Sequence, residues 1–200
     1  MVGWSIAAFR ACARVGSIVV ACPSAYDHGL SGPDLVVVDG GEARAVSVSN
    51  ALRAVETELV AIHDAARPLV TPELIEGVIA TLLADPEAAG AIAATPVTDT
   101  IKQSRRSMHS TPPSVLNASS GVEKTLDRER LWAAQTPQVF WAEALREALG
   151  ADPKRVKTAT DEAMLVEAAG GRMLIHPAPP ENLKVTTSLD LRLAELLLAR

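Results

Sequence analysis

The stretch LVAIHDAARPLVTPELIEGVIATLL, residues 59–83, decides the fold class of this protein. A run of Leu, Val and Ile at Leu59–His63 predicts a buried strand, and the polar pair His63-Asp64 ends it. Thr71 is a suitable helix cap and Pro72 suits the first helical position. Apolar residues then recur at helical spacing on one face: Leu74, Ile75, Val78, Ile79, Leu82 and Leu83. A strand, a loop and an amphipathic helix in direct succession are typical of an α/β protein.

The same alternation of short β-branched runs and helical stretches extends over the chain. It predicts further strands at Ser17–Ala21, Leu35–Asp39, Gly90–Thr95, Arg172–His176 and Leu183–Thr186. One helix is expected from near Thr160 to Gly170-Gly171, and another, capped by Ser188, continues to the C-terminus. We therefore expect a doubly wound, mostly parallel sheet with helices on its faces.

The composition is that of one ordinary globular domain. The 200 residues are 48% hydrophobic and 22% charged, enough to bury a core without disulfides or metals. A net charge of -5 argues against a broad nucleic-acid-binding surface, although a small anion needs only a local basic pocket. With neither a bilayer-length apolar run nor a basic signal-peptide start, the expected location is the cytoplasm. Cys12 and Cys22 are expected to be plain thiols.

One segment interrupts the pattern. Residues 103–123 are rich in Ser, Pro, Arg and Asn and mostly lack an apolar period. A long irregular segment inside a compact domain is usually functional or disordered, so we expect a projecting loop or hairpin here. No internal repeat and no second domain are indicated.

Asp64 and Arg67 are the strongest candidates for a ligand site. They follow a strand and precede a helix, and ligands of open α/β sheets bind beyond the carboxyl ends of strands. An Asp at this place can hold Mg²⁺, which prefers carboxylate oxygens together with water and substrate phosphate. The alternative, equally favoured by the spacing, is a local ion pair that stabilises the loop.

Other polar residues allow two interpretations each. Lys184 either lies on a solvated strand face or supplies a cation to a phosphate. Arg128 either clamps a phosphate or pairs with a neighbouring carboxylate. The extended segment 135–138, which includes Thr136, either contacts a ligand or only ends a strand. Arg44 and Ser47 open a helix after Gly40-Gly41, where backbone N–H groups can receive a nucleotide.

Some chemistries find no support. A zinc site is not indicated, because the four histidines are scattered and have no partners at zinc-ligand spacing: His28, His63, His109 and His176. No G-x-S-x-G motif provides the nucleophile of a serine hydrolase.

Five motifs in fixed order carry a family resemblance that covers essentially the whole chain. They are HDAARPLV at 63–70, TDTIK at 98–102, TLDRERLWAAQTPQVF at 125–140, TDEAMLVEAAG at 160–170 and ENLKVTTSLDLRLAE at 181–195. This series resembles the 2-C-methyl-D-erythritol 4-phosphate cytidylyltransferases, although HDAxRP alone is shared with ribitol-phosphate cytidylyltransferases. The resemblance implies a Rossmann-like nucleotidyltransferase that transfers CMP from CTP to 2-C-methyl-D-erythritol 4-phosphate and requires Mg²⁺. Such a reaction depends on positioning and charge neutralisation, and not on a protein nucleophile.

The resemblance also implies roles for individual residues. Asp64 matches the aspartate for the metal and the CTP phosphates, and Arg67 the adjacent phosphate-binding arginine. Arg44 and Ser47 match the segment near the cytidine, and Lys184 matches a lysine that stabilises the transition state. Three further residues lie in matching motifs: Thr136, Thr160 and Glu181. The resemblance implies that Glu181 is a second metal ligand.

In this family the equivalent of residues 103–123 is an arm that embraces a second subunit. Thr100 and Arg128 match residues that bind the methyl-erythritol phosphate and reach the partner's site. A homodimer with shared active sites is therefore expected.

The start of the chain departs from the family pattern. Family members begin with a strand and a Gly-rich loop that wraps the CTP phosphates, whereas MVGWSIAAF resembles the segment that follows this loop. On this reading Met1 is an internal methionine, and the 200-residue chain alone is expected to be weakly active or inactive. The alternatives are a cytidylyltransferase for another sugar-alcohol phosphate and a non-catalytic dimerisation partner that keeps the family fold.

Overall fold

A computed structural model describes residues 1–25, 29–105, 121–151, 156 and 158–199. The chain forms two compact units, Met1–Ala94 with Ala134–Arg200, and Thr95–Ala133. The elements of the first unit are α1 (Val2–Ala11), β1 (Ile18–Cys22), β2 (Leu35–Asp39), α2 (Arg44–Leu52), β3 (Leu59–Ile62), α3 (Pro72–Leu83), β4 (Gly90–Pro96), β7 (Trp132–Trp141), α4 (Ala142–Ala151), α6 (Glu162–Ala168), β8 (Met173–Pro177) and α7 (Ser188–Leu198), with the first residues of β7 and the last of β4 in the second unit.

The strands of the first unit pair in two groups. β1 and β2 are parallel, with Ile18 opposite Leu35. The other group has the order β3-β7-β4-β8, in which β4 and β8 are parallel. β7 runs antiparallel to β3, with Val60 opposite Phe140. The α/β class and most predicted strands are confirmed to within one or two residues, whereas β7 was not foreseen as a strand.

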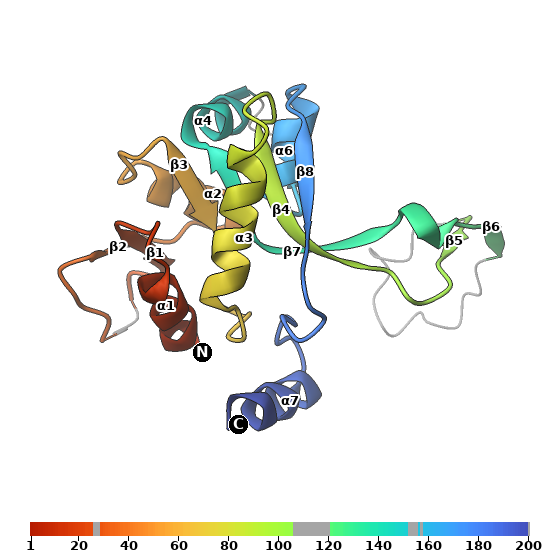
Figure 1. Ribbon diagram of the computed structural model, residues 1–200, viewed down its shortest axis with the longest axis horizontal. Coiled ribbons are helices and arrows are strands. Elements are labelled where there is room, and N and C mark those ends of the chain that lie inside the picture. Colours follow the sequence, from red (N-terminus) through yellow and green to blue (C-terminus); the bar gives the residue numbers. More distant parts are fainter. Residues whose placement is uncertain (26–28, 106–120, 152–155, 157, 200) are drawn as a thin grey trace. The chain divides into compact units, whose positions relative to one another are not determined.

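Helices cover both faces of the sheet, as Figure 1 shows for α3 in front of β4. Successive residues of a strand point to opposite faces, and β7 demonstrates this: Val139 packs with α1 and α3, while Phe140 packs with α2, α4 and α6. Two apolar cores result, one on each side. This double burial explains why the strands read as continuous apolar runs.

The helix ends largely follow the predicted chemistry. Thr71 caps α3 by accepting a hydrogen bond from the Leu74 N–H at 3.2 Å, and Pro72 is the first helical residue. Asp161 caps α6. The cap of α7 is Thr187, one residue before the predicted Ser188, because its hydroxyl and the Asp190 carboxylate form a reciprocal capping box.

The predicted strand at Leu183–Thr186 is wrong. The segment has no regular secondary structure, and its described backbone bond to another element is that of the Val185 N–H to the Ala66 carbonyl at 2.8 Å. Its residue pattern suits a strand, yet its position beyond the strand ends provides no strand to pair with.

The second unit contains the base of the predicted arm. β5 (Lys102–Ser104) and β6 (Val122–Thr125) form an antiparallel pair, followed by a 3₁₀ turn at Arg128–Arg130. The Gln103 amide donates to the Glu123 carboxylate across the pair at 3.0 Å. The two ends of the predicted arm therefore pair with each other; residues 106–120 lie outside the described residues, and the arm stays a prediction.

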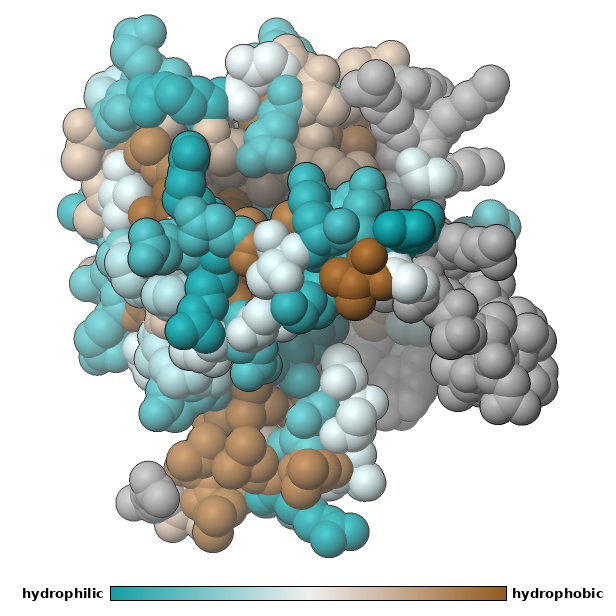
Figure 2. Space-filling view, turned by 90° about the vertical axis from the view of Figure 1, so that its right-hand side faces the viewer, coloured by the Kyte–Doolittle hydropathy of each residue, from teal (hydrophilic) through white to brown (hydrophobic). Residues whose placement is uncertain are grey.

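The C-terminal helix α7 exposes apolar side chains. Leu189, Leu191, Leu193 and Leu196 are exposed, and Figure 2 shows the apolar surface gathered at the bottom of the view, where α7 lies. Gathered exposed apolar side chains of this kind mark interaction surfaces. No helix in the described part of the chain is long and apolar enough to span a bilayer.

Candidate functional site

Asp64 is the centre of a cluster of charges at the carboxyl end of β3. Its Oδ1 accepts a hydrogen bond from Arg44 Nε at 3.0 Å, and its Oδ2 lies 3.1 Å from Lys184 Nζ. The Nε of Arg67 lies 3.9 Å from the same Oδ2. The structure thus brings together four residues that the sequence identified separately, from a strand end, a helix start, a loop and an extended segment near the C-terminus.

Arg44 also binds a second carboxylate, which the sequence did not single out. Arg44 is the first residue of α2, and its NH1 donates to Oε2 of Glu162 in the first turn of α6. The Glu162 side chain is fully buried. One guanidinium therefore connects α2 with α6 and with the end of β3.

His63 and Thr136 hold the backbone beside Asp64. The Asp64 N–H donates to the Thr136 hydroxyl oxygen at 3.0 Å, and that oxygen lies 3.0 Å from His63 Nδ1. His63 Nε2 lies 3.1 Å from the Arg67 carbonyl oxygen, which only accepts. The network therefore assigns the proton to Nε2, so that Nδ1 accepts from the Thr136 hydroxyl. The sequence left open whether Thr136 contacts a ligand or only ends a strand; here it orients the loop that carries Asp64.

Asn182 holds Arg67 in place. Its backbone carbonyl accepts from Arg67 NH1 at 2.8 Å, while its amide nitrogen donates to the Gln135 side chain and to the Thr136 carbonyl. Asn182 and Gln135 are both buried. A buried amide with these partners rigidifies its surroundings, so Arg67 is a fixed cation near Asp64.

Ser47 shapes the start of α2. Its hydroxyl accepts from the Gly41 N–H at 3.0 Å and donates to the Ala43 carbonyl at 3.2 Å. A Cβ at Gly41 would collide with Val46, so the loop can approach the helix this closely only with glycine. Ser47 thereby fixes the loop that brings Arg44 toward Asp64.

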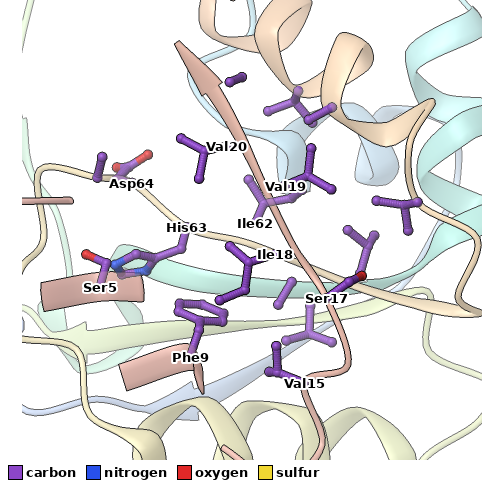
Figure 3. Close-up of a pocket in the computed structure, with 18 of the residues that line it drawn as sticks. Ser5, Phe9, Val15, Ser17, Ile18, Val19, Val20, Ile62, His63 and Asp64 are labelled. Atoms are coloured by element: carbon purple, nitrogen blue, oxygen red, sulfur yellow. The ribbon is translucent and has the colours of Figure 1, made fainter. Parts of the chain in front are cut away.

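A pocket of about 730 Å³ lies beside this cluster, between β1 and β3. Figure 3 shows Ile18, Val19 and Ile62 facing it, with Asp64 at one end. Its walls are mainly apolar, whereas its polar end is formed by Arg44, Ser47, Asp64 and Lys184. In the described part of the chain, β1 and β3 belong to separate strand groups and do not pair with each other. Ligand pockets commonly combine apolar walls with a few convergent polar groups.

Other predicted residues are not joined to this cluster. Thr160 is exposed, and its described contact is a long one, 4.0 Å to the Met164 sulfur. Glu181 is exposed, and no described contact joins it to Asp64. Thr100 and Arg128 belong to the second unit, where Arg128 NH1 donates to the Thr98 carbonyl. Arg128 thus has a local partner, although not the neighbouring carboxylate that the sequence suggested.

Charge, and not burial, decides the ionisation of Asp64. Burial alone would raise the pKa of its carboxyl, but Arg44 and Lys184 outweigh that effect and the pKa lies below its usual value. Asp64 is therefore an anion at neutral pH. Three cations surround it, whereas Glu162 is the only other carboxylate that contacts them among the described residues. The cluster therefore carries excess positive charge and favours an additional anion such as a phosphate.

The donor set fits Mg²⁺ held partly by a substrate. Among the residues that the structure describes, no group of three or more His, Cys, Asp or Glu is arranged to hold a metal. Mg²⁺ does not need such a cage, because it is commonly bound by one or two carboxylates with water and substrate phosphates. The ionised Asp64 at the edge of the pocket is the one described carboxylate that suits this role in the cluster, since Glu162 is fully buried.

We expect His63 to make stability depend on pH. Burial lowers its pKa from 6.5 to about 4, so the folded protein holds a neutral ring. Between pH 6.5 and 4 the unfolded chain binds a proton that the folded chain does not, so stability falls as the pH falls through this window. The full loss is roughly 3 kcal/mol, reached near pH 4.

Urea unfolding between pH 7.5 and 4 measures this effect. His63→Gln should flatten the decline, whereas His176→Gln, at the other described histidine, should retain most of it. An equally steep decline in His63→Gln would show that another group causes it.

Comparison with known proteins places the whole chain in one group. The family model described as 2-C-methyl-D-erythritol 4-phosphate cytidylyltransferase matches residues 1–200. Enzymes of that name from Symbiobacterium thermophilum and Bordetella petrii are 42% identical over 164 residues and 38% identical over 203 residues. The alignments cover 81% and 98% of this chain; the chain spans 63% of the first relative, less than two thirds of it, and 84% of the second.

Solved structures agree. The cytidylyltransferase of the same name from Thermus thermophilus superposes with a TM-score of 0.77 at 30% identity, covering 99% of this chain and 88% of its own. That from Francisella tularensis has a TM-score of 0.81 at 28% identity, covering 98% and 86%. The α/β nucleotidyltransferase fold is therefore shared.

Proposed function

This chain belongs to the family of 2-C-methyl-D-erythritol 4-phosphate cytidylyltransferases, and from that premise we propose that it transfers CMP from CTP to 2-C-methyl-D-erythritol 4-phosphate. The observation that carries the proposal is the cluster of Arg44, Arg67 and Lys184 around Asp64 at the polar end of a pocket. Such a cluster suits a substrate with several phosphates. The product would be the CDP-linked alcohol, a precursor for isoprenoid synthesis.

The reaction needs no nucleophile from the protein. A phosphate oxygen of the acceptor forms a bond to the α-phosphorus of CTP, the bond to the β-phosphate oxygen breaks, and pyrophosphate leaves. The protein positions both substrates and neutralises the charge that accumulates on the phosphates. Arg44 and Arg67 are held by Glu162 and Asn182, so they are preorganised for this purpose.

Lys184 is the most exposed cation of the cluster. Its side chain is 44% exposed, against 31% for Arg44 and 10% for Arg67, and its described partner is Asp64. We propose that its ammonium turns from Asp64 toward a bound phosphate. A compact ammonium at this position stabilises charge that develops on the α-phosphate.

Mg²⁺ is proposed as the cofactor, with Asp64 as the residue that holds it and Glu181 as a second ligand on the family pattern. When bound, the ion supplies positive charge to the CTP phosphates. Ser47 orders the loop at the nucleotide end of the pocket, and Thr136 orients the backbone of Asp64. Thr160 directly precedes Asp161, the N-cap of α6, and we propose that it contributes to nucleotide binding.

Pyrophosphate release tests the function. The protein, expressed with any residues that precede Met1 in its coding sequence, is incubated with CTP, 2-C-methyl-D-erythritol 4-phosphate and Mg²⁺, and parallel reactions contain ribitol 5-phosphate or no acceptor. We expect Mg²⁺-dependent release with the first acceptor alone, and CTP binding by calorimetry. Release with ribitol 5-phosphate alone would assign a different acceptor, and the absence of both release and CTP binding would refute the proposal.

A homodimer in the cytoplasm is the proposed state of the protein. The hairpin of β5 and β6 and the exposed leucines of α7 support an interface between two copies. In the proposed dimer, Thr100 and Arg128 bind the acceptor phosphate in the partner's site. Sedimentation velocity at micromolar concentration should show a dimer, and a monomer at every concentration up to that range would contradict it.

A further inference from the structure

Glu162 has no assigned part in the reaction, although its environment is unusual. It is a carboxylate at 0% exposure in the first turn of α6. Its Oε2 accepts from Arg44, whereas its Oε1 is a buried oxygen with no hydrogen-bond partner in the described structure. Burial raises the pKa of this carboxyl, and Arg44 only partly opposes the rise. A charge buried at such a cost needs a reason, and the contact with Arg44 supplies one.

The contact constrains how Arg44 meets Asp64. Arg44 uses Nε for Asp64 and NH1 for Glu162, so its guanidinium lies between the two carboxylates. A guanidinium facing a single carboxylate prefers to bind both of its oxygens through two parallel N–H bonds. Without the pull of Glu162, Arg44 would be free to turn and cover both oxygens of Asp64.

We propose that Glu162 is a positioning residue, which limits Arg44 to one bond with Asp64 and so keeps the Asp64 carboxylate available to a Mg²⁺–CTP complex. The inference rests on the proposed function. Lys184 contacts the other carboxylate oxygen of Asp64, but its partly exposed side chain can turn away when a ligand binds there. Arg44 is 31% exposed and lines the pocket.

Glu162→Gln tests this role, since the amide keeps the size of the side chain and removes its charge. We expect the Mg²⁺ concentration for half-maximal CTP binding, measured by calorimetry, to rise roughly tenfold to a hundredfold. In the metal-free protein, the NMR signal of the Arg44 Nε–H, identified by its loss in Arg44→Gln, should shift. The control is Glu167→Gln, an exposed carboxylate in the same helix, which should change neither value.

The double variant Arg44→Gln/Glu162→Gln separates positioning from general damage. With Arg44 gone, Glu162 has no guanidinium to position, so the double variant should have the same Mg²⁺ half-point as Arg44→Gln alone. An unchanged half-point in Glu162→Gln, or a double variant with a higher half-point than Arg44→Gln, would overturn the inference. Absence of Mg²⁺-dependent CTP binding in the unaltered chain would instead refute the proposed function.

Discussion

Asp64→Asn should lower kcat/KM for pyrophosphate release by roughly a thousandfold. The amide keeps the shape of the side chain but removes the negative charge that Arg44 and Lys184 now stabilise. A neutral amide is also a poor ligand for Mg²⁺, so CTP binding should lose its dependence on the ion. Steady-state kinetics and calorimetry over a series of Mg²⁺ concentrations measure both effects.

The matched control is Asp34→Asn. Asp34 is an ion-paired carboxylate outside the cluster, with Arg10 at 2.8 Å, and both partners are partly exposed. Its replacement should leave activity unchanged. If Asp64→Asn retained the kcat/KM and the Mg²⁺ requirement of the unaltered chain, Asp64 could not be the metal-binding aspartate.

Lys184→Gln is expected to lower kcat about a hundredfold while leaving the fold intact. Asp64 keeps Arg44 as a partner in this variant and the Lys184 side chain is 44% exposed, so stability should change little. The lost cation acts on the reacting phosphates, so kcat should fall more than the affinity for CTP. The measurements are kcat, KM for CTP and the urea midpoint.

Lys184→Arg and Arg172→Gln complete this experiment. The planar guanidinium of the arginine variant should not restore full activity, since it does not reproduce a compact point charge. Arg172 forms an exposed ion pair with Asp85 at 2.7 Å, and its replacement controls for loss of a surface cation. A loss of activity that merely parallels a lower urea midpoint would argue against a direct role for Lys184.

Elements with local signals could be predicted from neighbouring residues alone. The succession of strand, polar loop and capped helix at residues 59–83 is encoded in neighbouring residues, and the structure reproduces it down to the Thr71 cap. The family resemblance then implied roles for Asp64, Arg67, Arg44 and Lys184. The spacing at Asp64 and Arg67 allowed an ion pair or a ligand site; the structure shows the ion pair, at 3.9 Å, and the ligand site stays a prediction.

The distant residues that hold this cluster in place could not be predicted, because their contacts depend on how the elements pack. Glu162 reads as a helix-dipole residue in the sequence, and its contact with Arg44, 118 positions away, depends on how α6 packs. β7 was missed because its polar residues are buried: Gln135 and Gln138 find partners in Asn182 and Asp161, which local patterns do not reveal. Leu183–Thr186 has the residues of a strand but no neighbouring strand to pair with. Periodicity is a property of adjacent residues, whereas pairing and the satisfaction of buried charges depend on the packed fold.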